Sequence, residues 1–199
     1  MLHLYLKWNY SLFSFLENLQ LSFFERKPRQ VPSFLPKEIQ FRSVQKSTLI
    51  EYTSTREKTT TLRERDGVLH ISGNLHRTLV KKTINKWIAK QAKAYFIPEL
   101  EKLSAQTRLS YSNVRFKNTR SRWGSCSEKK TINLNIQMLF LPKHLSDQVL
   151  LHELCHLAHL NHSKDFWSLV ASFEPNYKSL ERELKHNGRQ YLPGWILRR

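Results

Sequence analysis

The feature that most constrains this chain is the run HELCHLAHLNH (152–162), which holds four of its nine histidines. Its first five residues form the pattern H-E-x-x-H, in which two histidines are four positions apart. On a helix, positions i and i+4 lie on one face, so the imidazoles of His152 and His156 can reach the same metal ion. Leucines surround the pattern, and burying these polar groups among them without a metal would be costly. The run therefore predicts a half-buried helix that carries a metal site.

Zinc is the ion that this pattern favours. Two imidazoles on one helical face can approach Zn²⁺ at the usual distance of about 2.0–2.1 Å. Glu153 is rotated by about 100° from His152, which places its carboxylate beside the metal without making it a ligand. Bound zinc lowers the pKa of water to about 7, and a neighbouring carboxylate can take the proton. We therefore predict that Glu153 is a general base.

A catalytic zinc site needs a third protein ligand and an open position. His159 lies about 4.5 Å further along the helix than His156, which would carry it past the metal. Asn161 tolerates the left-handed conformation that ends helices, so a reversal there could bring His162 back to the metal. The interval from His156 to His162 equals that of the extended pattern H-E-x-x-H-x-x-G-x-x-H, with His159 replacing its glycine. We predict His162 as the third ligand. The rival third ligands are Glu174, Glu181 and Glu183.

The rest of the chain predicts an α+β fold with a small N-terminal sheet, a long helix and the helix that carries the metal site. Asp66-Gly67 is a strong hairpin signal, and Pro98 predicts a kink or a break in the long helix. The expected strands are Leu49–Tyr52, Thr59–Arg65, Val68–Ser72, Val114–Phe116 and Thr131–Asn135. The expected helices are His76–Gln106, Pro142–His159, a helix capped by Ser163 that runs to Phe173, and Tyr177–Lys185.

The first 46 residues differ in amino-acid composition from the rest of the chain. Residues 1–24 are rich in aromatic and aliphatic side chains at helical spacing, and residues 25–46 contain Pro28, Pro32 and Pro36. We expect residues 1–46 to be an N-terminal extension and linker, and residues 47–199 to form the domain. No run approaches the roughly 20 apolar residues of a membrane span. Cys126 and Cys155 are too few for a disulfide scaffold, so we expect free thiols in a cytoplasmic protein.

Three segments together resemble the YgjP-like family of zinc-dependent metallopeptidases, which is akin to the WLM and SprT-like zincins. They are SRWGSCS (121–127), the strand INLN (132–135) and HELCHLAHLNHSKDFW (152–167). The resemblance extends over about Thr48–Trp195. It implies a compact zincin-like domain that cuts a peptide or protein, with one Zn²⁺ on His152, His156 and His162 and Glu153 as general base. It also implies that the Asn133–Asn135 strand lies near the cleft.

Some roles stay open. Two interpretations fit the residues Arg120, Arg122 and Trp123 equally well. They could contact a substrate or a phosphate group, or Trp123 could belong to the core while the two arginines pair with carboxylates. Tyr177 and His186 are both candidates for stabilising an oxyanion, and nothing in the sequence selects either. The two cysteines are weaker candidates as additional metal ligands.

The charge of the chain supports a second hypothesis, a protein associated with nucleic acid. Lys and Arg number 33 against 16 Asp and Glu, a formal net charge of +17. Residues 56–130 hold 18 basic and 6 acidic residues, and four lysines share one face of the long helix. The zinc site would then process proteins cross-linked to DNA, or be structural. A structural site usually has four protein ligands rich in Cys, which this motif lacks. The four lysines are Lys82, Lys86, Lys90 and Lys93.

Overall fold

The N-terminal sheet has four strands in the order β1-β2-β4-β3. The computed structural model describes residues 32–197, which belong to one compact unit. β2 runs antiparallel to β1 and parallel to β4, and β3 pairs antiparallel with β4. Asp66 and Gly67 both have positive φ (51° and 76°), as the two-residue turn of a β3–β4 hairpin requires. The strands are β1 (Glu38–Phe41), β2 (Lys46–Ser54), β3 (Thr60–Arg65) and β4 (Val68–Gly73).

Strand β1 lies inside the segment 25–46 that we expected to be a linker, so that expectation is wrong for Glu38–Phe41. Ile39 and Phe41 alternate with exposed neighbours and are buried, which pairs this short edge strand with β2 and with the core. A four-residue strand between proline-rich and polar residues gives too short an alternation to recognise. The helix expected within residues 1–24 lies outside the described residues, and a separate role for residues 1–46 stays a prediction.

The long helix α2 (Arg77–Thr107) runs through Pro98 without interruption, so the helix does not break there. Proline removes one backbone donor, but the helix is buried along its whole length at intervals of three and four residues. Burial of that stripe outweighs one missing hydrogen bond. The buried apolar residues are Val80, Ile84, Trp87, Ile88, Ala92, Phe96 and Leu100.

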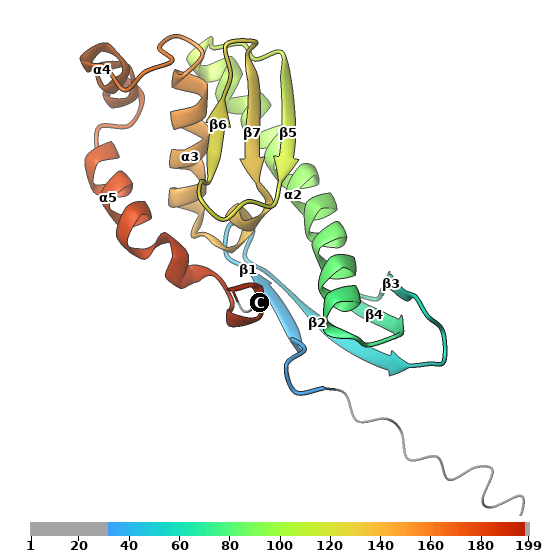
Figure 1. Ribbon diagram of the computed structural model, residues 1–199. Helices are drawn as coiled ribbons and strands as arrows, with labels where there is room; N and C mark the ends of the chain where they lie inside the picture. Colours follow the sequence, from blue (N-terminus) through green and yellow to red (C-terminus); the bar gives the residue numbers. More distant parts are fainter. Residues whose placement is uncertain (1–31, 198–199) are drawn as a thin grey trace, which may run out of the picture. The chain divides into compact units, whose positions relative to one another are not determined.

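A second sheet has three strands in the order β5-β7-β6, with β7 parallel to β5 and antiparallel to β6. β7 is therefore central and paired on both sides, and β6 is an edge strand. α2 packs beside β5 and α3 packs beside β6, so the two helices flank this sheet (Figure 1). The elements are β5 (Asn113–Lys117), β6 (Gly124–Cys126), β7 (Thr131–Asn135) and α3 (Lys143–Cys155).

Apart from one short 3₁₀ helix that precedes α3, the remaining elements follow α3 and cover one side of it (Figure 1). Ser163 caps α4 as expected, because its Oγ accepts a hydrogen bond from the backbone N–H of Phe166 at 3.3 Å. α5 runs two residues further than the expected end at Lys185. These elements are α4 (Lys164–Phe173), α5 (Tyr177–Asn187), the short 3₁₀ helices η1 (Ile136–Phe140) and η2 (Gly188–Tyr191), and α6 (Gly194–Leu197).

One core joins the two sheets. Phe41 from β1 stacks on Trp87 of α2 and meets the edge of Phe140 from η1, with ring centroids 5.4 and 5.3 Å apart. Ser43, which is only 2% exposed, lies with its Oγ 2.7 Å from the carbonyl oxygen of Met138 and 2.8 Å from that of Leu141. These contacts hold the N-terminal sheet against the segment that begins α3.

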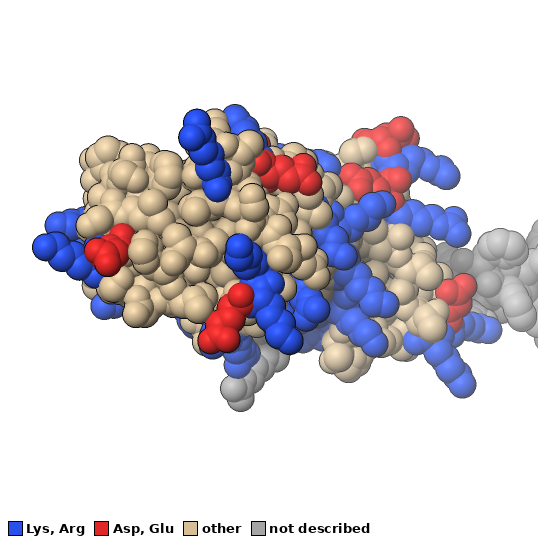
Figure 2. Space-filling view, turned by 90° about the horizontal axis from the view of Figure 1, so that it is seen from above, with Lys and Arg blue, Asp and Glu red and all other residues tan. Residues whose placement is uncertain are grey.

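The α+β class expected from the sequence is confirmed. Among the described residues, no helix is long and apolar enough to cross a membrane. The four lysines predicted to share a face of α2 are all exposed. On the side of the molecule seen in Figure 2, Lys and Arg outnumber Asp and Glu.

Candidate metal centre

The end of α3 and the loop that follows it hold all four predicted site residues. His152 and Glu153 lie in the last turn of α3, and His156 is its C-terminal cap. His162 lies in the connection to α4, one residue before Ser163 caps that helix. The cap at Ser163 and the end of α3 thus fix both ends of a short loop that carries His162.

The three predicted ligands converge. One nitrogen from each of His152, His156 and His162 lies within 4.8 Å of the others, and the Nε2 atoms of His152 and His162 are 3.0 Å apart. Nitrogens held 2.0–2.1 Å from a tetrahedral ion lie roughly 3.3 Å apart, so the spacing suits a zinc ion. His159 and the described carboxylates are not part of this cluster.

α3 ends earlier than predicted, at Cys155 rather than near His159. The backbone N–H groups of Leu157 and Ala158 reach back three residues, to Leu154 and Cys155, which tightens the last turn. Asn161 does not adopt the left-handed conformation that we expected. The chain turns because the helix stops directly after His156, which leaves six residues to bring His162 back.

The hydrogen bonds of the imidazoles leave the Nε2 atoms of His152 and His156 available to a metal. Nδ1 of His156 lies 2.9 Å from the main-chain oxygen of His159, and Nδ1 of His152 lies 3.1 Å from Oε1 of Glu181. Both oxygens accept hydrogen bonds, so each Nδ1 carries the proton and each Nε2 carries the lone pair. His159 therefore contributes its carbonyl group, not its side chain.

Burial lowers the pKa of His156 and of His162. The imidazole of His152 lowers both pKa values further, and that of His162 also lowers the pKa of His156. A histidine must be neutral to bind a metal, so the environment favours the form that binds.

Aromatic rings fix the orientation of the imidazoles. Phe166 stacks on His156 with centroids 4.5 Å apart, and Trp167 stacks on His162 at 5.5 Å. Tyr177 stacks in turn on Trp167 at 5.3 Å. The sequence motif ends in the pair Phe166-Trp167, but its spacing did not reveal which ring would cover which histidine. The ring of Tyr177 thus supports the site through Trp167.

Glu153 is nearly buried, with 5% of its surface exposed, and its Oε2 atom has no hydrogen-bond partner among residues 32–197. Burial raises its pKa to about 7, and the nearby charge of Glu181 adds to this effect. The neighbouring side chains of His152 and Arg122 act in the opposite direction and lower this pKa. Its carboxyl group can therefore both accept and release a proton near neutral pH.

Gly124 of β6 makes room for Glu153. A Cβ atom at Gly124 would lie 2.5 Å from Oε1 and 2.6 Å from Cγ of Glu153, well inside contact distance. Any larger residue would displace the carboxyl group, so the backbone of β6 forms one wall of the site. We quoted this glycine within the motif 121–127 without assigning it a role. Only the packing of α3 against β6 reveals that role.

Glu181 of α5 lies behind His152. It accepts hydrogen bonds from Nδ1 of His152 and from Nε2 of Gln148, the latter at 2.9 Å. Burial raises the pKa of Glu181, but these two hydrogen bonds together with the nearby imidazoles of His152 and His162 outweigh that effect and leave the pKa below its ordinary value. The ionised carboxylate therefore occupies the side of the ring opposite to Nε2. This arrangement suits an outer partner of a metal-binding histidine.

The other two rival ligands have partners elsewhere. Glu174 accepts a hydrogen bond from the backbone N–H of Asn176 at 2.9 Å. Glu183 contacts His144 at 3.3 Å and Tyr191 at 3.0 Å. Neither carboxylate faces the three histidines, which leaves His162 as the best-placed third ligand.

Both cysteines are free and lie outside the cluster. Cys155 is fully buried in a small apolar cluster with Leu151, Phe166 and Val170. Burial raises the pKa of the Cys155 thiol to about 12 and also raises that of Cys126. Neither thiol is thus disposed to ionise and bind the metal.

Trp123 is half-buried and packs on Gly188, where an added Cβ would lie 3.2 Å from its ring. Arg120 and Arg122 are exposed, and within the described part of the chain neither forms an ion pair. The packing of Trp123 agrees with the alternative in which it belongs to the core, but the two arginines form no ion pair with a carboxylate among the described residues. His186 lines a cavity beside Trp167 and Glu181.

These residues fit a metal ion. The site offers three convergent imidazoles, two of them with protonated Nδ1 atoms, and a buried carboxylate with one oxygen unpartnered. Nitrogen donors with a spare carboxylate and no thiolate are typical of a catalytic zinc site.

Such a site, on the end of a helix beside an edge strand, is characteristic of metallopeptidases. The chain belongs to the YgjP-like family, because the family model of the YgjP-like metallopeptidase domain matches residues 16–187. The match begins before Thr48 and includes part of the segment 1–46 that we expected to fall outside it.

Two solved structures of archaeal proteins are similar to part of the chain. The metallopeptidase zymogen abylysin of Pyrococcus abyssi is 27% identical, with a TM-score of 0.39. The metallopeptidase zymogen jannalysin of Methanocaldococcus jannaschii is 20% identical, also with a TM-score of 0.39. Each alignment covers 43% of this chain and 89% of the other. No curated protein matches the chain significantly.

Proposed function

We propose that this protein is a zinc-dependent peptidase. His152, His156 and His162 would hold the zinc ion, and Glu153 would act as general base. The observation that carries the proposal is the convergence of three imidazoles beside a buried carboxylate whose Oε2 has no hydrogen-bond partner in the described part of the chain. Glu181 would be a positioning residue, because it holds His152 in the tautomer that presents Nε2.

The reaction would be hydrolysis of a peptide bond. When bound, a zinc ion would polarise the scissile carbonyl and make water more acidic. Oε2 of Glu153 would accept a proton from the attacking water and deliver it to the departing amine. A pKa near 7 suits both halves of this transfer. The hydrogen-bonded rings of His152 and His156 would keep the site in one geometry throughout.

The substrate would add a strand to β6. β7 is paired on both sides, so it cannot accept a peptide, although the family resemblance pointed to its Asn133–Asn135 segment. Trp123 and Ser127 flank β6, and both form hydrogen bonds with β7. The carbonyl oxygen of Trp123 accepts one from β7, and the N–H of Ser127 donates one toward it. The antiparallel alternation then directs the polar backbone groups of Gly124 and Cys126 away from β7. A peptide at this edge would pass Glu153, which packs on Gly124.

The nucleic-acid hypothesis is less well supported. The family match points to a peptidase, and the exposed lysines of α2 are equally consistent with a solvated helix face. Zinc as the metal, the ligand set and the role of Glu153 are proposals that one experiment can test.

The experiment compares wild type with Glu153→Gln in a screen of unstructured peptides, with zinc content measured on the same samples. We expect zinc-dependent cleavage by wild type, and loss of cleavage in Glu153→Gln at unchanged zinc content. Glu183→Gln is the matched control, since Glu183 contacts His144 and Tyr191 instead of the histidine cluster. Cleavage that survives in Glu153→Gln would show that the mechanism is wrong.

A further inference from the structure

The cleft beside the metal centre is lined by basic residues. A cavity of about 720 Å³ has Trp167 and Glu181 in its wall, the residues that contact His162 and His152 respectively. Arg182, Lys185 and Arg189 line the same cavity, at spacings of three and four residues along α5 and η2. The cavity therefore leads from the predicted ligands along a positively charged helix face.

The charges of these three residues are not compensated. Arg182, Lys185 and Arg189 are exposed, and within the described part of the chain none of them forms an ion pair. Of the described residues that line this cavity, Glu181 alone is acidic, and it already accepts hydrogen bonds from His152 and Gln148.

A second cavity continues the first. It has a volume of about 310 Å³, shares Ser121, Trp123 and Arg189 with it, and adds Arg120 and Arg122. Residues 120–123 directly precede β6, so a peptide paired with β6 would extend toward these arginines. Arg189 donates a hydrogen bond to the main-chain oxygen of Arg120, which ties the two basic segments together.

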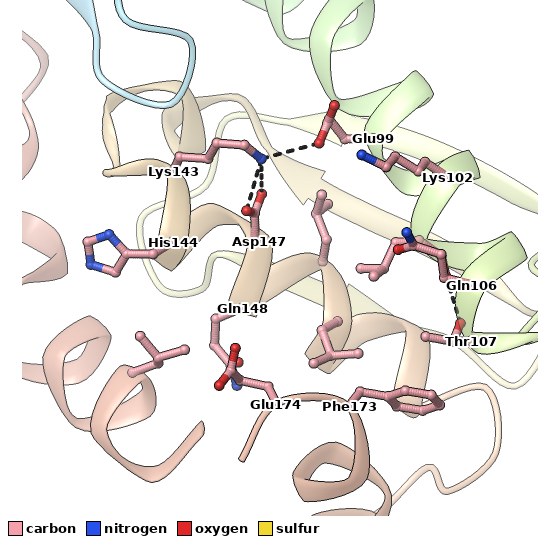
Figure 3. Close-up of a pocket in the computed structure, with 14 residues that line it drawn as sticks. Glu99, Lys102, Gln106, Thr107, Lys143, His144, Asp147, Gln148, Phe173 and Glu174 are labelled. Carbon is pink, nitrogen blue, oxygen red and sulfur yellow. Dashed lines mark hydrogen bonds and ion pairs between the residues drawn. The ribbon is translucent and has the colours of Figure 1, made fainter. Parts of the chain in front are cut away.

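The cavity of Figure 3 offers a contrast within the same protein. It has a volume of about 400 Å³, and there Lys143 lies between Glu99 and Asp147, 3.3 and 2.9 Å from their carboxylate oxygens. The charge of that lysine is thus balanced by the protein itself. Among the described residues the cations of the cleft have no such partners, so an acidic side chain bound there would meet positive charge that the protein does not compensate.

We propose that the cleft selects peptides with an acidic side chain close to the bond that is cut. Eight residues separate Glu181 from Arg189, about 12 Å of helix. An extended peptide covers that length in about four residues, so the acidic position lies within about four residues of the scissile bond. This inference rests on the proposed peptidase function and names its substrate class.

The test uses the full-length protein and a set of peptides with one common sequence. Glu replaces Gln at each of four positions on either side of the cleaved bond, and cleavage is followed at 50 and 200 mM salt. We expect kcat/KM about tenfold higher for Glu than for Gln at one or two neighbouring positions, because several exposed ion pairs form together. The preference should decrease at the higher salt concentration.

The matched variants have equal net charge. In Arg182→Glu/Lys185→Glu the preference for Glu should vanish or reverse toward Lys. Lys82→Glu/Lys86→Glu changes the net charge by the same amount on α2 and should keep the preference, since these lysines line a different cavity. Equal rates for Glu and Gln peptides, or equal loss in both variants, would overturn the inference.

A measurement of peptide binding tests this inference independently of the proposed peptidase activity. The affinity of labelled Glu and Gln peptides is measured by fluorescence anisotropy, which needs no turnover. If no peptide is cleaved, tighter binding of Glu peptides by wild type and not by the cleft variant still supports the inference. A single-stranded oligonucleotide that binds the cleft more tightly than any acidic peptide, and loses binding in the cleft variant, would assign the cleft to nucleic acid instead.

Discussion

The Nε2 atoms of His152 and His162 lie 3.0 Å apart, although ten residues separate the two histidines in the chain. The contact exists because α3 ends directly after His156 and because Ser163 caps α4 one residue after His162. Nδ1 of His152 carries the proton that it donates to Glu181, so the Nε2 lone pair of His152 faces Nε2 of His162 at hydrogen-bond distance.

Replacing His162 should abolish tight metal binding. We expect zinc affinity to fall more than about 100-fold in His162→Ala, since loss of an outer hydrogen-bond partner alone typically costs 10–100-fold. Competition with a chelator, followed by metal analysis, measures the change. His159→Ala is the control, because His159 contributes only its carbonyl oxygen. Unchanged zinc occupancy in His162→Ala would remove this residue from the ligand set.

Glu181→Gln should weaken zinc binding about 10–100-fold without removing a ligand. The amide accepts a weaker hydrogen bond from His152 and no longer fixes its tautomer. Glu183→Gln makes the same chemical change two residues away on α5 and should bind zinc like wild type. A purely structural role for Glu181 would instead lower thermal stability and leave the zinc affinity of the folded protein unchanged.

Gly124→Ala should impair turnover while zinc stays bound. The new Cβ would overlap Glu153, and relieving such overlap in a packed site costs about 1–3 kcal/mol. We expect lower kcat and a lower melting temperature at near-normal zinc content, because the three atoms nearest to the new Cβ all belong to Glu153 and none to a histidine. Wild-type kcat in Gly124→Ala would show that Glu153 need not lie against β6.

The stability of the N-terminal sheet should depend on pH through Glu64. Nε1 of Trp87 donates to this carboxylate at 3.0 Å, and that hydrogen bond is the main reason that its pKa lies below the ordinary value of 4.5. A lowered folded-state pKa gives stability that is present above pH 4.5 and is lost as the pH falls through the folded-state value. The carboxylate is partly exposed, so the effect is below about 1 kcal/mol.

Urea denaturation between pH 7 and 3 measures this contribution. The stability advantage of wild type over Glu64→Gln should shrink as the pH falls below 4.5. Glu57→Gln, on the exposed connection before β3, serves as the control for general charge effects. An advantage that is independent of pH would show that the Trp87 contact does not couple to ionisation.

The candidate site could be predicted largely because its spacing is local. H-E-x-x-H fixes two side chains on one face of a helix, and Ser163 signals where the next helix begins. Gly124, Gln148 and Glu181 could not be assigned roles in this way. Each meets the site through packing between elements far apart in sequence, which no periodicity encodes.

The fold could be predicted where the sequence patterns are long, and the prediction failed where they are short. The hairpin at Asp66-Gly67 and the long helix follow from turn chemistry and from a stripe of buried residues. β1 has four residues, too few for alternation to distinguish it from a loop. The end of α3 was misplaced because Leu157 and Ala158 favour helix locally, whereas the loop to α4 requires an early stop.

Ser43 sets a practical limit on where this chain can be shortened. A fragment that begins at residue 47, the boundary that the sequence alone suggests, would lack both Ser43 and Phe41. The carbonyl groups of Met138 and Leu141 would lose a buried donor, and Trp87 and Phe140 would face an empty space. A fragment that is to carry the candidate site must therefore retain the chain from β1 onward.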